Sequence, residues 1–446
     1  MAHRPNTVRF LASSALSLLG NSVASVVLPL VLLARTGDAL AAGTLALVCA
    51  VPQMLAGLLG GALLDRLNRR NVSIVSDFVS AASIALMPVV DMVWGLSFGW
   101  FVVLGLLGAV GDIPGMTARD TLLPAVTKRD GVDLQQFLGV SQSLDSLVTI
   151  IGPALAAFLI GFGGDINALW VTAALSCSAA LVTATLPRDV GAVSAGERTA
   201  ASPEIAANGE AGAAVGDNTS PLRSVVAAAR ASLSDGVRVL FKDDAVLRAS
   251  TLLTFGIVMV MGSFQGLVLP MHFTETGRPE QLGYVLSALS AGMLAGSLGY
   301  AALAPRARKR AWYVASLAGM AAGVAVMGTL TSFPALIAGA VVLGITAGPA
   351  SALLGFFAYD RIPAERRGSA LGTQNALLLA AAPVAMFATS VVVSAAGTAV
   401  AALVLVVAWM LVTLGALVVK SMRKLDFLDE CEPAVAADLA QGPDAS

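Results

Sequence analysis

Long apolar runs repeat along this chain, and they constrain its fold more than any other feature. A helix needs about 20 consecutive apolar residues to cross the hydrocarbon core of a bilayer. Twelve runs reach that length, centred near residues 21, 52, 83, 108, 148, 177, 259, 292, 320, 346, 381 and 408. Charged residues make up only 12% of the 446 residues, about half of the share that soluble domains carry. The sequence therefore predicts an all-α membrane protein with twelve transmembrane helices.

The positions of the basic residues predict how these helices are oriented. Of the 27 Lys and Arg residues, all but Arg35 and Arg278 fall in the even-numbered connections or in the two tails. Cytoplasmic loops carry the excess of Lys and Arg in membrane proteins. We therefore expect both termini to be cytoplasmic in a multi-pass protein of the cell membrane, and the first run to be an uncleaved span.

Composition also divides the chain into segments. We predict an N-terminal six-helix half over residues 1–188, a cytoplasmic linker over 189–245, a C-terminal six-helix half over 246–420 and a cytoplasmic tail over 421–446. The tail and the first part of the linker lack apolar periodicity and are expected to be largely disordered. Leu222–Phe241 has helical apolar spacing among arginines, which favours an amphipathic helix on the inner leaflet, with a merely solvated helix as the alternative.

Two pairs of loops reveal an internal repeat. GGALLDRLNRR ends at Arg70, and its counterpart GYAALAPRARKR follows the eighth run. LLPAVTKRDG after the fourth run similarly matches RIPAERRG after the tenth. The same offset separates Arg69 from Arg308 and Pro124 from Pro363. Parallel duplicated halves of this kind form secondary transporters that hold their substrate near the midplane between the halves.

With these loops the chain resembles the major facilitator superfamily, whose second loop is usually written G-x-L-A-D-R-x-G-R-K. The matching residues here are Gly61, Leu63, Asp65, Arg66, Arg69 and Arg70. Asn68 replaces the glycine of the pattern, and asparagine tolerates a left-handed backbone, so we expect the turn to be retained. The segment 361–376 is similar to the equivalent loop of bacterial drug and siderophore exporters.

The resemblance implies that this loop gates the carrier. Asp65 would face the positive end of the eleventh helix, near Gly368, when the carrier is open outward. Asp77 could pair with Arg66 or Arg69. Alternatively, the arginines only fix the topology. The predicted gating residues are Gly61, Asp65, Arg66, Arg69, Arg70, Asp77, Arg308, Lys309, Arg366 and Arg367.

Two carboxylates inside the predicted spans are candidates for proton coupling. Asp112 lies in span four and Asp145 in span five. Ionisable groups in the hydrocarbon are costly and normally mark a cavity or a proton path. Alternatively, each is a structural acid bonded to Ser, Thr or Gln, or paired with Arg119.

Uncharged polar residues at similar depth are candidates for lining a substrate cavity. They are Asn21, Gln53, Gln142, Gln265, Gln374 and Asn375. Asn21 and Gln265 are favoured because spans one and seven line the cavity in the family that the chain resembles. Span five partly resembles an antiporter motif around Gly152 and Pro153, but close helix packing explains its small residues equally well.

These patterns favour a transporter over an enzyme. No G-x-x-x-x-G-K-[ST] phosphate loop and no H-E-x-x-H motif is present, and Cys49, Cys177 and Cys431 lack metal-ligand spacing. We expect no cofactor, metal, nucleotide or nucleic acid, and expect a small-molecule substrate, a proton and the lipid bilayer as partners. The leading hypothesis is proton-coupled export of amphipathic small molecules such as drugs or secondary metabolites. Its rivals are an uptake carrier or facilitator of the same fold and, more remotely, a non-transporting membrane receptor or scaffold.

Overall fold

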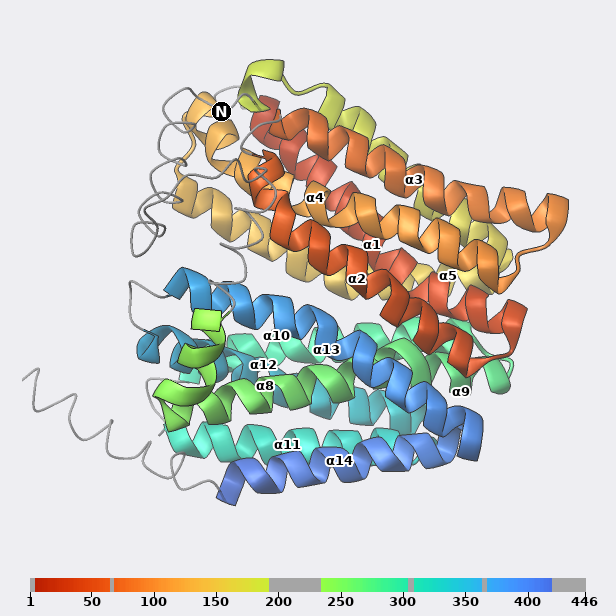
Figure 1. Cartoon of the computed structure of the whole chain (residues 1–446), viewed down its shortest axis with the longest axis vertical. Helices are drawn as coiled ribbons and strands as arrows, with labels where there is room; N and C mark the ends of the chain where they lie inside the picture. Colours follow the sequence, from red (N-terminus) through yellow and green to blue (C-terminus); the bar gives the residue numbers. More distant parts are fainter. Residues whose placement is uncertain (1–4, 65–67, 192–233, 304–308, 363–366, 419–446) are drawn as a thin grey trace, which may run out of the picture.

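Helices account for nearly all of the described chain, which comprises residues 5–64, 68–191, 234–303, 309–362 and 367–418 of a computed structural model (Figure 1). The α-helices are α1 Pro5–Thr36, α2 Ala39–Leu64, α3 Arg69–Trp94, α4 Phe98–Asp130, α5 Leu134–Ala184, α8 Ala245–Ser263, α9 Leu269–Glu275, α10 Glu280–Leu303, α11 Lys309–Gly328, α12 Phe333–Arg361, α13 Arg367–Ala396 and α14 Thr398–Val418. Three short helical elements complete the fold: the 3₁₀ helix η1 Arg188–Gly191 and the π-helices η2 Val239–Asp243 and η3 Phe264–Val268.

Ten of the described helices are long and apolar enough to cross a membrane. The described residues do not confirm the twelve spans that the sequence predicts, and they differ from the prediction at two elements. α5 counts once although its 51 residues contain a break at Gly164, whose φ of 79° and ψ of 172° are not helical. α2 has 26 residues, but only Ala39–Met54 contributes as a shorter apolar helix.

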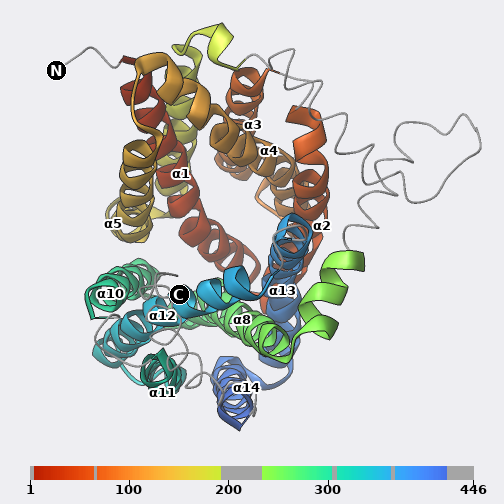
Figure 2. The same cartoon turned by 90° about the vertical axis from the view of Figure 1, so that its left-hand side faces the viewer.

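The bundle consists of two halves that lie side by side (Figures 1 and 2). α1 to α5 form the first half, in which α1 packs against α5 and α3 packs against α4. α8 to α14 form the second, in which α12 packs against both α10 and α11. The described helices thus form two packed groups.

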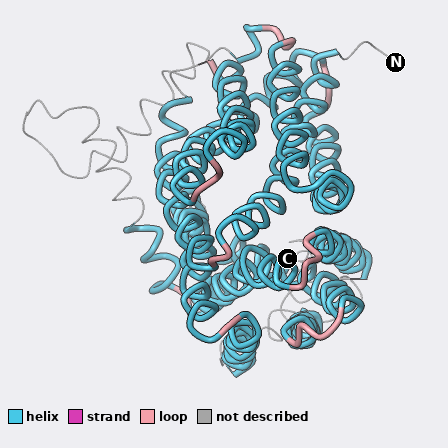
Figure 3. Tube along the Cα trace, turned by 90° about the vertical axis from the view of Figure 1, so that its right-hand side faces the viewer, coloured by secondary structure: helices cyan, strands magenta, loops and turns pink. Residues whose placement is uncertain are grey.

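The two ends of the bundle differ. α1 begins and α14 ends at the same end, which we call the tail end (Figure 1). At the opposite, far end, short turns join the helices (Figure 3). Each of these turns contains a residue with a positive φ, as does the break at Gly164 in α5; the turn residues are Gly37, Gly95, Gly277, Leu330 and Gly397.

The halves contact each other near the far end, through α5 with α10 and through α2 with α13. The backbone of Gly283 on α10 lies so close to the Pro153 carbonyl of α5 that a Cβ would overlap it. Ser287 Oγ, one turn further along α10, donates a hydrogen bond of 2.8 Å to the carbonyl of Ile150. On α2, a Cβ at Gly43 would overlap Ser390 of α13. These backbone approaches hold the far end of the bundle closed.

Three glycines nearer the tails on the same helices make no such approach. A Cβ added at Gly139 of α5, Gly299 of α10 or Gly372 of α13 would meet no atom within 4 Å. The close backbone contacts between the halves at Gly283 and Gly43 therefore lie near the far end.

Paired aromatic side chains lie at both ends of the bundle. Trp94 at the end of α3 stacks on Trp100 at the start of α4, with ring centroids 5.9 Å apart, and is 70% exposed. At the tail end, Tyr300 and Trp312 meet edge to face at 5.3 Å. Trp and Tyr gather at membrane interfaces, so these pairs are consistent with the two boundaries of the hydrocarbon core.

The connection between the halves is described only at its last part. Most of the predicted amphipathic segment, Leu222–Phe241, lies outside the described residues. Its end is helical over 234–238 and continues into η2. There Leu240 is fully buried in a small core that includes Ile362 and Ala370. This end of the segment therefore packs on the second half of the protein.

Asp130 ties the end of α4 to the start of α1. Its carboxylate accepts hydrogen bonds from the Thr7 backbone N–H at 2.7 Å, the Thr7 hydroxyl at 2.8 Å and the Asn6 amide at 2.8 Å. The first N–H groups of a helix lack intrahelical partners, so Asp130 caps α1 from another helix.

We predict that Asp130→Ala lowers the stability of the first half by roughly 1–2 kcal/mol, the usual cost of losing a helix N-cap. The measurement is the apparent Tm of the purified protein in detergent. Asp130→Asn retains one acceptor oxygen and is expected to lose less. Equal Tm values for Asp130→Ala and the unmodified protein would contradict the capping role.

Candidate substrate cavity and charged network

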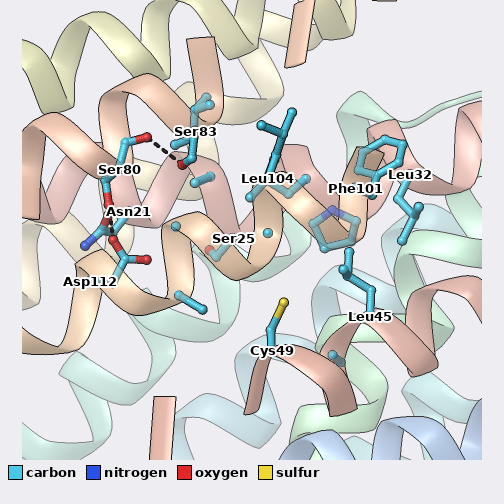
Figure 4. Close-up of a pocket in the computed structure, with 18 of the residues that line it drawn as sticks. Asn21, Ser25, Leu32, Leu45, Cys49, Ser80, Ser83, Phe101, Leu104 and Asp112 are labelled. Carbon is cyan, nitrogen blue, oxygen red and sulfur yellow. Dashed lines mark hydrogen bonds between the residues drawn. The ribbon is translucent and has the colours of Figure 1, made fainter. Parts of the chain in front are cut away.

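A cavity of about 430 Å³ lies among α1, α2, α3 and α4. Its wall is mostly apolar, and only Gly266 of η3 and Met386 of α13 come from the second half. Figure 4 shows Phe101 and Leu104 on the α4 side of the cavity and Leu45 and Cys49 on the α2 side. The volume lies within the range of sites that bind small organic molecules.

Asp112 is the charged residue in the cavity wall. Ser80 of α3 donates a hydrogen bond to Asp112 Oδ1, and the Ser83 hydroxyl bonds to the Ser80 carbonyl at 2.8 Å (Figure 4). Asn21 of α1 lies beside this pair in the cavity wall. Of the two structural roles that the sequence left open for Asp112, the contact with serine is the one observed.

A second charged group is buried next to the cavity. Asp77 on α3 is 3% exposed, accepts a hydrogen bond of 2.9 Å from Ser17 of α1, and forms an ion pair with Arg119 of α4. The sequence had suggested Arg66 or Arg69 as its partner. Arg119 reaches Asp77 because α3 and α4 pack along their length, which loop spacing alone does not reveal.

The structure brings together only part of the predicted site. Asn21, Gln53 and Asp112 line the cavity. Asp145 is half-buried on α5, outside the cavity wall, and interacts electrostatically with Asp120 of α4. The remaining candidates lie outside the wall as well: Gln142 and Asn375 are exposed, and Gln265 and Gln374 are half-buried. Their cavity-facing role stays a prediction.

Small residues in span five serve helix packing. A Cβ at Gly152 would overlap Ser22 of α1, and Ala156 is fully buried. The packing interpretation of this segment is therefore the one that its contacts support.

The predicted gating loop is described only at its edges. Asp65, Arg66, Arg308 and Arg366 lie outside the described residues. Gly61 belongs to α2, and Lys309 and Arg367 begin α11 and α13, but their side chains are not described. Arg69 begins α3, and Arg70 is buried, donating hydrogen bonds to the Ala184 carbonyl and to Asn71 Oδ1.

The expectation of a left-handed Asn68 is wrong. Its φ of −68° and ψ of 113° are extended, and its side-chain oxygen accepts from the N–H groups of Arg70 and Asn71. Its amide also donates to the Arg188 carbonyl at 3.0 Å. Asparagine occupies this position as the N-cap of α3, a role in which glycine has no side chain to contribute.

Two packed groups of helices and ten apolar helices of membrane-spanning length among the described residues are the features of an integral membrane protein. The sequence profile of the Major Facilitator Superfamily matches residues 10–268 and 251–428. The chain belongs to this superfamily of transporters, in which it is a multi-pass protein of the inner membrane.

Relatives with known names match most of the chain. The multidrug efflux pump Tap of Mycolicibacterium fortuitum is 30% identical over 413 residues, covering 91% of this chain and 94% of the relative. Tap of Mycobacterium tuberculosis is 27% identical over 416 residues, covering 93% of each. Macrolide efflux protein A of Streptococcus pyogenes is 25% identical over 177 residues, covering 40% of this chain and 43% of the relative.

Solved structures of distant sequence share the fold. The nucleoside transporter NupG aligns with a TM-score of 0.70 at 14% identity, covering 94% of this chain and 99% of that one. A bacterial homologue of ferroportin in an inward-facing state aligns with a TM-score of 0.62 at 16% identity, covering 93% of this chain and 100% of that one.

Proposed function

We propose that this protein is a secondary active transporter that exports amphipathic small molecules, including drugs, by alternating access. One observation carries the proposal: likeness to multidrug efflux pumps extends over nine-tenths of the chain, so that it includes both halves. The cavity suits such substrates because its wall is apolar and contains a few polar groups that can orient a ligand.

The proposed topology has twelve spans and cytoplasmic termini. α5 would supply spans five and six on either side of Gly164, and α2 would supply span two. The basic residues near the tail end support its placement in the cytoplasm. On this topology, the close contacts between the halves lie near the outer end, which supports an inward-facing state that accepts substrate from the cell.

Proton coupling is proposed at Asp112 and Asp145. Apolar surroundings favour the protonated form of a carboxylate, and each side chain would release its proton when its site opens to water. Asp112 is in the cavity itself, and Asp145 is half-buried on α5 outside the cavity wall. Neither proposal requires a cofactor, a nucleotide or a nucleic acid.

We predict that Asp112→Asn abolishes the dependence of transport on a pH gradient and that Asp145→Asn weakens it, because an amide cannot carry the proton. The measurement is substrate flux in proteoliposomes with and without an imposed gradient. If neither variant alters the response to the gradient, the assignment of the coupling sites is wrong.

The loop that contains Asp65 is proposed to latch the outward-facing state by meeting the N-terminus of α13. In the structure, α2 and α13 contact each other near the far end, at Gly43 and Ser390. In the outward-facing state, the latch would join the same two helices at the tail end instead. Unchanged transport and unchanged labelling of tail-end cysteine probes in Asp65→Asn would contradict this role.

Export is tested by a susceptibility and accumulation panel in cells with and without the gene, repeated with a protonophore. Cells that carry the gene are expected to accumulate less of several amphipathic compounds, and the protonophore should remove the difference. A difference that survives the protonophore favours a facilitator of the same fold. A panel unchanged by the gene contradicts drug export.

A further inference from the structure

The charge of the cavity wall is confined to one point. Among the described residues that line it, Asp112 alone carries a charge, and no Lys, Arg or His faces the cavity. The other polar groups are amides, hydroxyls and the Cys49 thiol. A ligand in this cavity therefore meets one negative site within an apolar surface.

The two oxygens of Asp112 have different surroundings. Oδ1 accepts the hydrogen bond from Ser80, which fixes the carboxylate against α3. No hydrogen bond to Oδ2 is seen among the described residues. Asp112 is only partly buried and lines the cavity, with Ser80 and Asn21 beside it (Figure 4).

The nearest basic side chain is already engaged. Arg119 forms its ion pair with Asp77, which Ser17 also holds. Arg119 still interacts electrostatically with Asp112, but it forms no ion pair with it. When Asp112 has released its proton, its negative charge therefore has no ion-pair partner among the described residues.

We propose that Asp112 binds the positive charge of the substrate directly, so that the cavity selects amphipathic cations over anions and neutral molecules of the same shape. This inference rests on the proposed export function and specifies its substrate class. Two attractions act together: the carboxylate attracts the charge at low effective dielectric, and the apolar wall buries the hydrophobic body.

The shape of the wall also orients the substrate. α4 contributes Phe101, Leu104, Gly105, Gly108, Ala109, Asp112 and Met116, a stripe about 20 Å long at 1.5 Å per residue. Asp112 lies toward the tail end of this stripe and Phe101 toward the far end. A bound cation therefore points its charge toward the tail end and its apolar body toward Phe101 and Leu45.

The test uses two ions of the same shape and opposite charge, tetraphenylphosphonium and tetraphenylborate, with the full-length protein in nanodiscs and empty nanodiscs as background. Tetraphenylphosphonium has no proton to lose, so its binding reports charge recognition alone. We expect saturable binding of the cation and none of the anion. In Asp112→Asn the cation should bind on the order of tenfold to a hundredfold more weakly, since a contact between unit charges is lost.

Two further variants keep the test decisive. Asp165→Asn removes the same charge at the far end, 3.5 Å from Arg35, and should change cation affinity by less than about twofold because salt screens distant charges. Asp112→Glu retains the charge and should retain most of the binding, which covers the case in which Asp112→Asn fails to fold. Equal binding of both ions, or unweakened cation binding in folded Asp112→Asn, would overturn the inference.

The outcomes also separate this inference from the export function. Selective, Asp112-dependent binding without any flux in proteoliposomes would remove the export proposal and leave the cation site. Flux together with equal binding of the two ions would remove the cation site and leave the export proposal.

Discussion

Replacing Asp77 by alanine is expected to destabilise the protein by about 3–5 kcal/mol, the cost of leaving one partner of a buried ion pair alone. Asp77 is 3% exposed, and its Oδ1 is held by both Ser17 and Arg119. The variant leaves the Arg119 guanidinium without its ion-pair partner between α3 and α4. The measurement is the yield of monodisperse protein and its apparent Tm in detergent.

Two comparisons separate charge pairing from loss of packing. The double variant Asp77→Asn with Arg119→Gln removes both charges and should recover much of the lost stability. Asp91→Ala breaks the more exposed pair with Arg35, at 3.0 Å, and should cost no more than about 1 kcal/mol. A stability in Asp77→Ala equal to that of Asp91→Ala would contradict the importance of the buried pair.

Introducing leucine at Gly283 is expected to open the far end and to stop transport. Gly283 allows α10 to approach the Pro153 carbonyl of α5, and any Cβ there overlaps that oxygen. Overpacking of this kind costs roughly 1–3 kcal/mol, which shifts a two-state equilibrium about tenfold to a hundredfold toward the outward-facing state. The variant should also lose the hydrogen bond from Ser287 to Ile150.

The measurement is labelling of a single cysteine at Gln142, toward the tail end of α5, in a background without Cys49, Cys177 and Cys431. Gly283→Leu should slow labelling there. Gly299→Leu is the matched control, since it adds the same side chain to the same helix where a Cβ meets nothing within 4 Å. Equal labelling in the two variants would show that the contact at Gly283 does not hold the far end closed.

Features determined by local composition could be predicted from the sequence. Apolar length predicted an all-α membrane protein, and the resemblance of the second loop predicted the superfamily. The number of spans was harder to compare with the number of helices, because α5 continues through Gly164 without a polar loop that separates two helices. Asn68 was assigned the wrong backbone because replacement of a glycine suggested a left-handed turn, whereas the side chain serves as an N-cap.

The site depends on contacts between helices, and these were harder to predict. Asp112 and Asn21 stood out because polar groups in apolar runs are costly, and both line the cavity. Ser80, which holds Asp112, carried no such signal, since a serine in a span is unremarkable. The pairing of Asp77 with Arg119 depends on how α3 packs on α4, and this packing cannot be inferred from spacing along the chain.

The most direct test of the account is uptake of tetraphenylphosphonium by inside-out membrane vesicles from cells that express the chain. If the protein is a proton-driven exporter, acidifying the vesicle lumen should drive accumulation of the cation against its gradient, and a protonophore should abolish it. Vesicles with Asp112→Asn should show neither effect. Accumulation that is indifferent to the protonophore, or that occurs only in right-side-out vesicles, would contradict the account.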